Sequence, residues 1–238
     1  MSPMQALLDE ARLNRVFSMQ WRILSFGFGG DDLRALNRDH QIFGVIATLL
    51  VGVGRYWDHP DPYLFQSLGI GSLSIAALLS LLVYLVVLPL KPRDWDLANL
   101  ATFITLTALP ALLYAIPVER FLALPQARSA NVAFLAAIAA WRVGLLYAYL
   151  RRRAEFPRWL SVVALLLPTA GVIVVLTALN LEQAVFDLMS GLHDDSTPAD
   201  AAYSALALIT AFALILFPAL VAAYIAGIVL RRRSAAAR

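Results

Sequence analysis

Six long apolar segments divide the sequence, and they constrain its fold more than any other feature. They cover residues 41–57, 64–90, 98–117, 131–150, 159–180 and 202–230. A helix needs about 20 apolar residues to cross a hydrocarbon core about 30 Å thick, and the last five segments reach that length. The first segment is shorter and contains three glycines. The sequence therefore predicts an all-α, polytopic bundle of six transmembrane helices.

Composition supports this class. The chain is 61% hydrophobic and 15% charged, whereas an ordinary soluble domain carries about 25% charged residues. These values exclude intrinsic disorder, fibrous repeats and most soluble enzymes. Because the 238 residues include no cysteine, thiol nucleophiles, thiolate zinc sites and iron–sulfur clusters are excluded as well.

The basic residues predict the orientation of the bundle. Cytoplasmic loops of membrane proteins carry an excess of Lys and Arg. With six crossings, most of the 19 basic residues lie on one side, and the opposite side holds only Arg55, Arg120 and Arg128. We therefore expect both termini in the cytoplasm. The excess of Arg, Ala and Leu is typical of a GC-rich bacterial genome, so the expected location is a bacterial inner membrane.

The predicted domains follow from these crossings. Residues 1–40 form a cytoplasmic segment, residues 41–230 the transmembrane domain, and residues 231–238 a basic cytoplasmic tail. Within the first segment, residues 4–26 read as an amphipathic helix. Its apolar face carries Leu13, Val16, Phe17, Ile23 and Leu24. Basic residues beside such a face suit an anionic leaflet, but a helix packed under the bundle fits the same pattern.

Small residues at four-residue spacing predict where the spans pack closely. The stripes are Ser72, Ala76 and Ser80; Ala136, Ala140, Gly144 and Ala148; and Ala219, Ala223 and Gly227. Three spans also contain an internal proline, at Pro110, Pro168 and Pro218. Each proline removes a backbone hydrogen bond and is expected to bend its helix.

Arg142 is the strongest candidate for a functional residue. It lies about 14–16 Å from either end of the span 131–150, where a charge costs about 2.5–3.5 kcal/mol on insertion scales. No Asp or Glu falls within any span, so its partner must be a hydroxyl, a carbonyl, water, an aromatic face or an exogenous anion. The candidate partners are Tyr84, Thr102, Thr105, Trp141 and Thr169. Two interpretations remain open: an anion or lipid-headgroup site, and a structural arginine bonded to helix-end carbonyls.

A second candidate cluster lies on the predicted external side. It comprises Arg55, Asp58, His59, Asp61 and Glu119. Asp58, His59 and Asp61 are capable of binding a metal, but the prolines at positions 60 and 62 favour a rigid turn that brings them together incidentally. An ion pair of Glu119 with Arg55 or Arg120 is the more ordinary expectation.

The sequence lacks the common catalytic signatures. It contains no His-Glu-x-x-His zinc motif, no Gly-x-Ser-x-Gly elbow and no phosphate-binding loop with Lys. We therefore expect no enzyme activity and no cofactor. The basic residues sit at helix ends, so nucleic acid is not an expected partner. The expected partners are membrane lipids, together with other membrane proteins or further copies of the chain.

Short motifs between residues 90 and 168 carry a family resemblance. They are Ala108-Leu109-Pro110, Trp141-Arg142 with a basic exit, and Pro157-Arg158-Trp159 leading into Leu165-Leu166-Leu167-Pro168. In these motifs the chain resembles the Yip family of membrane proteins. That family typically has five spans, and its Asp-Leu-Tyr-Gly-Pro motif is absent here, so no functional residue carries over. The resemblance implies a non-catalytic helical protein related to membrane organisation or trafficking.

Three functional hypotheses follow. The first is a membrane interaction, scaffold or membrane-organisation protein without catalysis. The second is a transporter or channel-like subunit that binds an anion or lipid headgroup near Arg142. The third is a lipid-modifying enzyme, which would depend on Asp58, His59 and Glu119.

Overall fold

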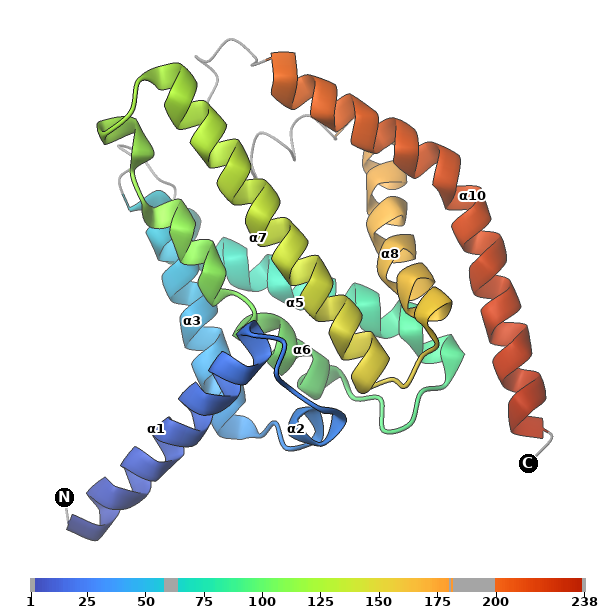
Figure 1. Ribbon diagram of the computed structural model, residues 1–238, viewed down its shortest axis with the longest axis horizontal. Helices are drawn as coiled ribbons and strands as arrows, with labels where there is room; N and C mark the ends of the chain where they lie inside the picture. The colour runs from blue at the N-terminus through green and yellow to red at the C-terminus, as the bar shows by residue number, and fades with distance from the viewer. Residues whose placement is uncertain (1–2, 58–63, 180, 182–199, 237–238) are drawn as a thin grey trace. The chain divides into compact units, whose positions relative to one another are not determined.

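The computed structural model describes residues 3–57, 64–179, 181 and 200–236 (Figure 1). Throughout these residues the regular structure is helical, with no strand. The chain divides into two compact units. Unit 1 comprises residues 1–85 and 92–155, and unit 2 comprises residues 86–91 and 156–238. The predicted all-α class is therefore confirmed for the described part of the chain.

Most of the helices belong to unit 1. In chain order they are α1 (Pro3–Leu24), α2 (Gly30–Arg34), α3 (Arg38–Tyr56), α4 (Leu64–Ser67), α5 (Ile70–Val87), α6 (Leu97–Leu106), the 3-10 helices η2 (Leu109–Ala115) and η3 (Val118–Arg120), and α7 (Leu124–Arg152). Unit 2 holds the last residues of α5, the 3-10 helix η1 (Leu88–Leu90), α8 (Arg158–Ala178) and α10 (Asp200–Ala236).

Four helical stretches are long and apolar enough to cross a membrane: residues Ile70–Leu90, Pro125–Arg152, Arg158–Ala178 and Ala207–Arg233. The bent pair of α6 and η2 makes a fifth if it counts as one span. Helix α3 is formed but is not among them. Between its charged residues Asp39 and Arg55 only about 22 Å of helix remains, less than a hydrocarbon core of about 30 Å. A membrane-embedded helical protein is therefore supported, whereas the count of six spans stays a prediction.

The predicted span 98–117 is broken rather than continuous. Helix α6 ends at Leu106, and η2 leaves it at an angle of 41°. Pro110 has no N–H to donate to the carbonyl of Leu106, four residues earlier. The side chain of Gln20 takes that place, because its Nε2 donates to the Leu106 oxygen at 2.6 Å. The bend expected at Pro110 is thus confirmed, and its free carbonyl binds α1.

Helix α1 packs on the rest of unit 1 through only part of the predicted apolar face. Val16, Gln20 and Ile23 are buried, whereas Leu13 and Phe17 are more than half exposed. The contact therefore separates residues that the apolar periodicity places together on one face. The structure supports the packing of α1 against other helices, and contact of its exposed side with a leaflet stays a prediction.

Helix α3 makes its closest contacts through glycine. A Cβ added at Gly44 would lie 2.4 Å from the Thr105 Oγ1 of α6, and a Cβ added at Gly52 would lie 2.6 Å from the Cα of Gly69. Gly69 itself has a φ of 69°, a left-handed conformation that favours glycine. These contacts were not predicted from the sequence, although Gly44 and Gly52 are spaced by two turns of helix.

The predicted small-residue stripes differ in outcome. In α5, Ala76 and Ser80 are buried, as expected. In α7, Ala136 and Ala140 are exposed, and only the later part of that stripe is packed. In unit 2, α8 and α10 lie side by side (Figure 1), and Gly227 allows a close approach to Leu160. Pro168 and Pro218 lie inside these helices without ending them.

Candidate functional site

Arg142 lies on the inner side of unit 1. Helix α7 places it ten residues before Arg152, a distance of about 15 Å along the axis. One turn earlier on the same face, Ile138 belongs to a buried cluster with Val51, Ala108 and Ala111. Arg142 is half-buried, and side chains on a helix lean toward its N-terminus. A side chain with this orientation would extend along α7 toward the Ile138 cluster.

Tyr114 is the residue that the structure brings to Arg142. Its side chain packs against the Ile138 cluster, and it interacts electrostatically with both Arg142 and Arg55. The Arg55 guanidinium lies 5.5 Å from the centre of the Tyr114 ring. Arg55 of α3 thus contacts the Tyr114 ring of η2, and Arg142 of α7 interacts with the same residue electrostatically.

Arg142 has no anionic partner within the described part of the chain. It takes part in none of the ion pairs found there, and no hydrogen bond of its guanidinium is formed with those residues. A guanidinium offers five N–H donors in a fixed planar fork and matches carboxylate or phosphate. Among the described residues, Arg142 therefore supplies donors and positive charge without a matching acceptor.

The outer rim of the site is tied together by Trp57. Its Nε1 donates to the carbonyl of Ala115 at 2.9 Å, which links the end of α3 to the end of η2. The Arg120 guanidinium lies 5.3 Å from the centre of the Trp57 ring. Because Arg55 and Tyr114 stand next to the two linked ends, this contact fixes the spacing of the site.

The predicted hydroxyl partners of Arg142 bond elsewhere. Thr102 donates to Ala98 and Thr105 donates to Ala101, both within α6. In membrane helices, threonine often satisfies its hydroxyl on the carbonyl one turn earlier. Thr169, in unit 2, does the same within α8.

The predicted aromatic partners also have other contacts. Tyr84 stacks on Trp95, with the ring centres 6.3 Å apart. Trp141 uses its indole N–H on the carbonyl of Leu24 at 3.0 Å. The structure therefore does not bring either residue into a hydrogen bond with Arg142.

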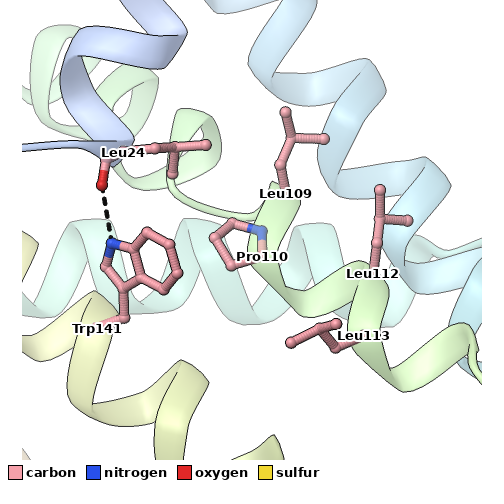
Figure 2. Close-up of a pocket in the computed structure, with 6 residues that line it drawn as sticks. All are labelled: Leu24, Leu109, Pro110, Leu112, Leu113 and Trp141. Carbon is pink, nitrogen blue, oxygen red and sulfur yellow. Dashed lines mark hydrogen bonds between the residues drawn. The ribbon is translucent and has the colours of Figure 1, made fainter.

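Unit 1 also contains an apolar groove of about 410 Å³ (Figure 2). It is formed by the end of α1, by η2 and by α7. Its lining residues are Leu24, Leu109, Pro110, Leu112, Leu113 and Trp141. The polar cavity expected around Arg142 is thus not this groove, whose walls are hydrocarbon and aromatic rings.

The predicted external cluster falls mostly outside the described residues. Asp58, His59 and Asp61 belong to residues 58–63, and the side chain of Glu119 is not described either. Arg55 is the member that can be placed, and it contacts Tyr114. Among the described residues, no group of three or more metal-capable side chains comes together.

Two further arginines have roles that the sequence did not reveal. Arg152 donates to the carbonyls of Phe26 and Phe28 and lies over the Phe28 ring at 4.6 Å. Arg153 is only 6% exposed and donates to the carbonyl of Asp94. In the sequence, Arg152 and Arg153 belong to a basic stretch after a span, which predicts only the orientation of that span in the membrane. Their hydrogen bonds to the carbonyls of neighbouring loops were not predictable from this pattern.

No family model, curated protein or solved structure matches the chain. The functional interpretation therefore depends on the geometry around Arg142, and the resemblance to the Yip family stays a prediction.

Proposed function

We propose that this protein is a non-catalytic integral membrane protein that binds the anionic headgroup of a lipid through Arg142 and Arg55. The observation that carries the proposal is the lack of an anionic partner for Arg142 among the described residues, together with its electrostatic interaction with Tyr114, whose ring Arg55 contacts. The proposal joins two of the sequence hypotheses: a role in membrane organisation and an anion site at Arg142. The Yip resemblance supports the first part only.

The cost of placing the guanidinium supports a bound anion. A charge near the centre of a span costs about 2.5–3.5 kcal/mol on insertion scales. A charge-assisted hydrogen bond returns about 1.5–3 kcal/mol, and a phosphate accepts two such bonds from one guanidinium. A lipid phosphate thus offsets a cost that Tyr114, a neutral phenol, offsets only in part.

The apolar groove favours a lipid over a transported ion. A channel or transporter for hydrated anions needs a polar path, whereas the groove formed by α1, η2 and α7 is lined by apolar residues. The lipid-modifying enzyme would use Asp58, His59 and Glu119, whose side chains lie outside the described part of the chain. Lipid binding is therefore the function that the described residues favour.

The proposal includes the predicted topology. We place six spans, with α3 as the first, in a bacterial inner membrane with both termini in the cytoplasm. The distribution of basic residues supports this arrangement. Helix α3 is short, but Trp57 and Arg120 stand at its predicted outer end, where aromatic and basic side chains favour an interface.

Native mass spectrometry of the full chain in detergent tests the binding. Dioleoyl phosphatidylglycerol is the anionic probe, and dioleoyl phosphatidylcholine is the zwitterionic control. We expect the anionic lipid to bind preferentially and Arg142→Gln to weaken its binding about tenfold or more. Arg142→Lys keeps the charge but loses the fork, so it should retain part of the preference.

The matched control is Arg158→Gln. Arg158 is an exposed arginine in the first turn of α8, in unit 2, so its loss should leave the lipid preference unchanged. Equal binding of both lipids by the unmodified protein contradicts the proposal. An unchanged preference in Arg142→Gln contradicts it as well.

A further inference from the structure

Helix α1 ends beside the middle of α7 rather than beside its end. The Trp141 Nε1 of α7 donates to the Leu24 carbonyl of α1 at 3.0 Å (Figure 2). Trp141 stands eleven residues before Arg152, the last residue of α7, which is about 16 Å along the helix axis. That distance is about half of a hydrocarbon core of about 30 Å. The last turn of α1 is therefore level with the middle of a predicted span.

A second contact places α1 at a similar depth. The Gln20 Nε2 of α1 donates to the carbonyl of Leu106, the last residue of α6. Helix α6 begins nine residues earlier at Leu97, so Leu106 lies about 14 Å from the start of α6. Tyr149, near the end of α7, donates to Asn99, near the start of α6, at 2.8 Å, so both depths are counted from the same side. Figure 1 shows α1 ending next to the break between α6 and η2.

After α1 ends, the chain returns to that side along α7. Arg152 donates to the carbonyls of Phe26 and Phe28. Gly30 lies against the end of α7, because a Cβ added there would be 3.0 Å from the Arg152 carbonyl oxygen. Residues 25–30 therefore run from the end of α1 to the end of α7. Helix α1 and this return segment form a hairpin that enters and leaves unit 1 on one side.

The turn of this hairpin satisfies backbone groups from within the protein. The Gly27 N–H donates to the Arg22 carbonyl at 2.8 Å. The Phe26 N–H donates to the Ile23 carbonyl at 3.0 Å. These two bonds form a Schellman motif, with Phe26 at a φ of 60° in the left-handed position. The next carbonyl, at Leu24, accepts from the indole of α7. Backbone groups inside a bilayer must find partners of this kind, because water is absent there.

The exposed surface of α1 divides into an apolar and a polar face. Leu13, Phe17 and Trp21 are 55%, 54% and 72% exposed. Because they are spaced by four residues, they form one stripe along the helix. On the polar face, Arg22 forms an ion pair with Asp32 of α2 at 2.7 Å. The polar face is thus turned toward α2, whereas the apolar stripe is open.

We infer that α1 is a re-entrant helix and that its stripe of Leu13, Phe17 and Trp21 contacts the acyl chains of the cytoplasmic leaflet. Helices α6 and α7 are membrane-embedded in the proposed function, on which this inference rests, but headgroup binding is not required for it. Depth determines the partner, because an apolar stripe that ends level with the middle of a span meets hydrocarbon. A helix lying flat on the leaflet would instead hold all three positions at one depth.

Nitroxide labels on single cysteines test this position, because the chain has no cysteine of its own. The variants are Leu13→Cys, Phe17→Cys and Trp21→Cys, each a full chain reconstituted in dioleoyl phosphatidylcholine vesicles. Power saturation with oxygen and with a water-soluble nickel chelate measures the depth of each label. Positions 13 and 21 are separated by about 12 Å of helix, so we expect the label at position 21 to lie at least about 6 Å deeper. Equal depths at the three positions overturn the re-entrant helix.

Two further labels serve as controls. Val143→Cys, at an exposed position of α7, should report the middle of the bilayer. Ser18→Cys, at an exposed position on the polar face of α1, should be more accessible to the nickel chelate than Phe17→Cys. Equal accessibility at positions 17 and 18 overturns the assignment of the apolar stripe to lipid.

The outcomes separate this inference from the proposed function. A deep label at position 143 with shallow labels on α1 refutes the re-entrant helix and leaves the proposed function standing. A shallow label at position 143 refutes the membrane-embedded α7 on which both proposals depend. Loss of the preference for anionic lipid leaves the hairpin standing, because the vesicles carry no net charge. Low accessibility to both reagents, with spin–spin broadening, shows that a second copy of the chain covers the stripe and overturns its contact with lipid.

Discussion

Gln20 and Pro110 act on one carbonyl oxygen although they lie in different helices. Pro110 leaves the Leu106 oxygen without its intrahelical donor, and Gln20 donates to it at 2.6 Å. Gln20 is only 4% exposed, so the bond forms away from water. A polar residue in the buried stripe of α1 is thereby explained by a proline in η2.

This pairing predicts a double-mutant cycle. Gln20→Leu should lower the free energy of unfolding by about 1 kcal/mol, because the Leu106 carbonyl loses its donor. This loss of stability is small for a buried hydrogen bond, because the Oε1 atom of Gln20 is itself buried without a hydrogen-bond partner. Its removal therefore relieves part of the cost. In a Pro110→Ala background the restored N–H competes for the carbonyl, so the same change should cost less. Thermal unfolding in detergent gives the stability of the unmodified protein, the two single variants and the double variant. If Gln20→Leu costs the same stability in the unmodified protein as in the Pro110→Ala background, the two residues do not act on the same carbonyl.

His40 gives the protein a predicted pH response. Burial lowers the pKa of His40 below its ordinary value of 6.5, Asp39 raises it, and Arg15 lowers it further. The folded state therefore favours the neutral imidazole. Its contribution to stability is complete above pH 6.5 and is lost as the pH falls below 6.5 toward the lower pKa of the folded state.

Unfolding measured between pH 8 and pH 5 checks this response. We expect the stability of the unmodified protein to fall over the lower part of the range, and His40→Asn to show a smaller decline. His193→Asn is the control for loss of a histidine and should decline like the unmodified chain. A decline in His40→Asn equal to that of the unmodified chain rules out His40 as its source.

At the scale of elements, the close packing of α3 against α6 depends on the absence of a side chain at Gly44. A Cβ there would lie 2.4 Å from the Thr105 Oγ1 and 3.2 Å from the Leu106 nitrogen. Gly44→Ala should therefore destabilise the protein by about 1–3 kcal/mol, because the helices must separate. Thr105→Ala in the same chain removes the closest atom and should recover part of the loss in thermal unfolding.

Gly171→Ala is the matched substitution in α8. A Cβ at Gly171 would lie 3.6 Å from the Phe217 ring, an ordinary contact. Alanine also favours a helix over glycine by about 1 kcal/mol, so this change should be neutral or stabilising. Equal losses from the two substitutions would show that glycine flexibility, rather than the contact with Thr105, determines the effect.

The positions of the long helices were predictable, and their packing was less so. Apolar length locates α5, α7, α8 and α10, and Pro110 locates the break after α6. Apolar periodicity fails for α1, because the buried stripe includes the polar Gln20 and leaves Leu13 and Phe17 exposed. The sequence shows which residues are apolar, but Gln20 is buried for the sake of a carbonyl that only the folded chain brings near.

The candidate site shows the same division. The lack of acidic residues in the spans predicts an Arg142 without a carboxylate partner, and this stays a prediction. Tyr114 was not predictable as its neighbour, because the break after Leu106 resets the register of the chain. Residues of a 3-10 helix advance about 120° each rather than 100°, so a periodicity counted from α6 assigns the wrong faces in η2.

At the scale of the whole molecule, the basic residues have two roles. Arg152 and Arg153 bond to loop carbonyls, whereas Arg158 and Arg232 are exposed. Both groups add to the basic excess on one predicted side, and that excess determines orientation when the chain inserts. The short helix α3 then decides whether the basic N-terminal segment shares that side, because residues 1–40 precede it.

Cysteine labelling tests this topology in a chain that has no cysteine of its own. Ser18→Cys in α1 precedes α3 in the chain, and Ser67→Cys in α4 follows it, in the first turn of the predicted span 64–90 at its outer end. Ser196→Cys and Ser234→Cys flank the last predicted span. In intact cells, an impermeant thiol reagent should label positions 67 and 196 from outside. Positions 18 and 234 should label only after the membrane is opened, because six crossings place them in the cytoplasm. Labelling of positions 18 and 67 from the same side would show that α3 does not cross, and the N-terminal segment with its arginines would then lie opposite the C-terminal tail.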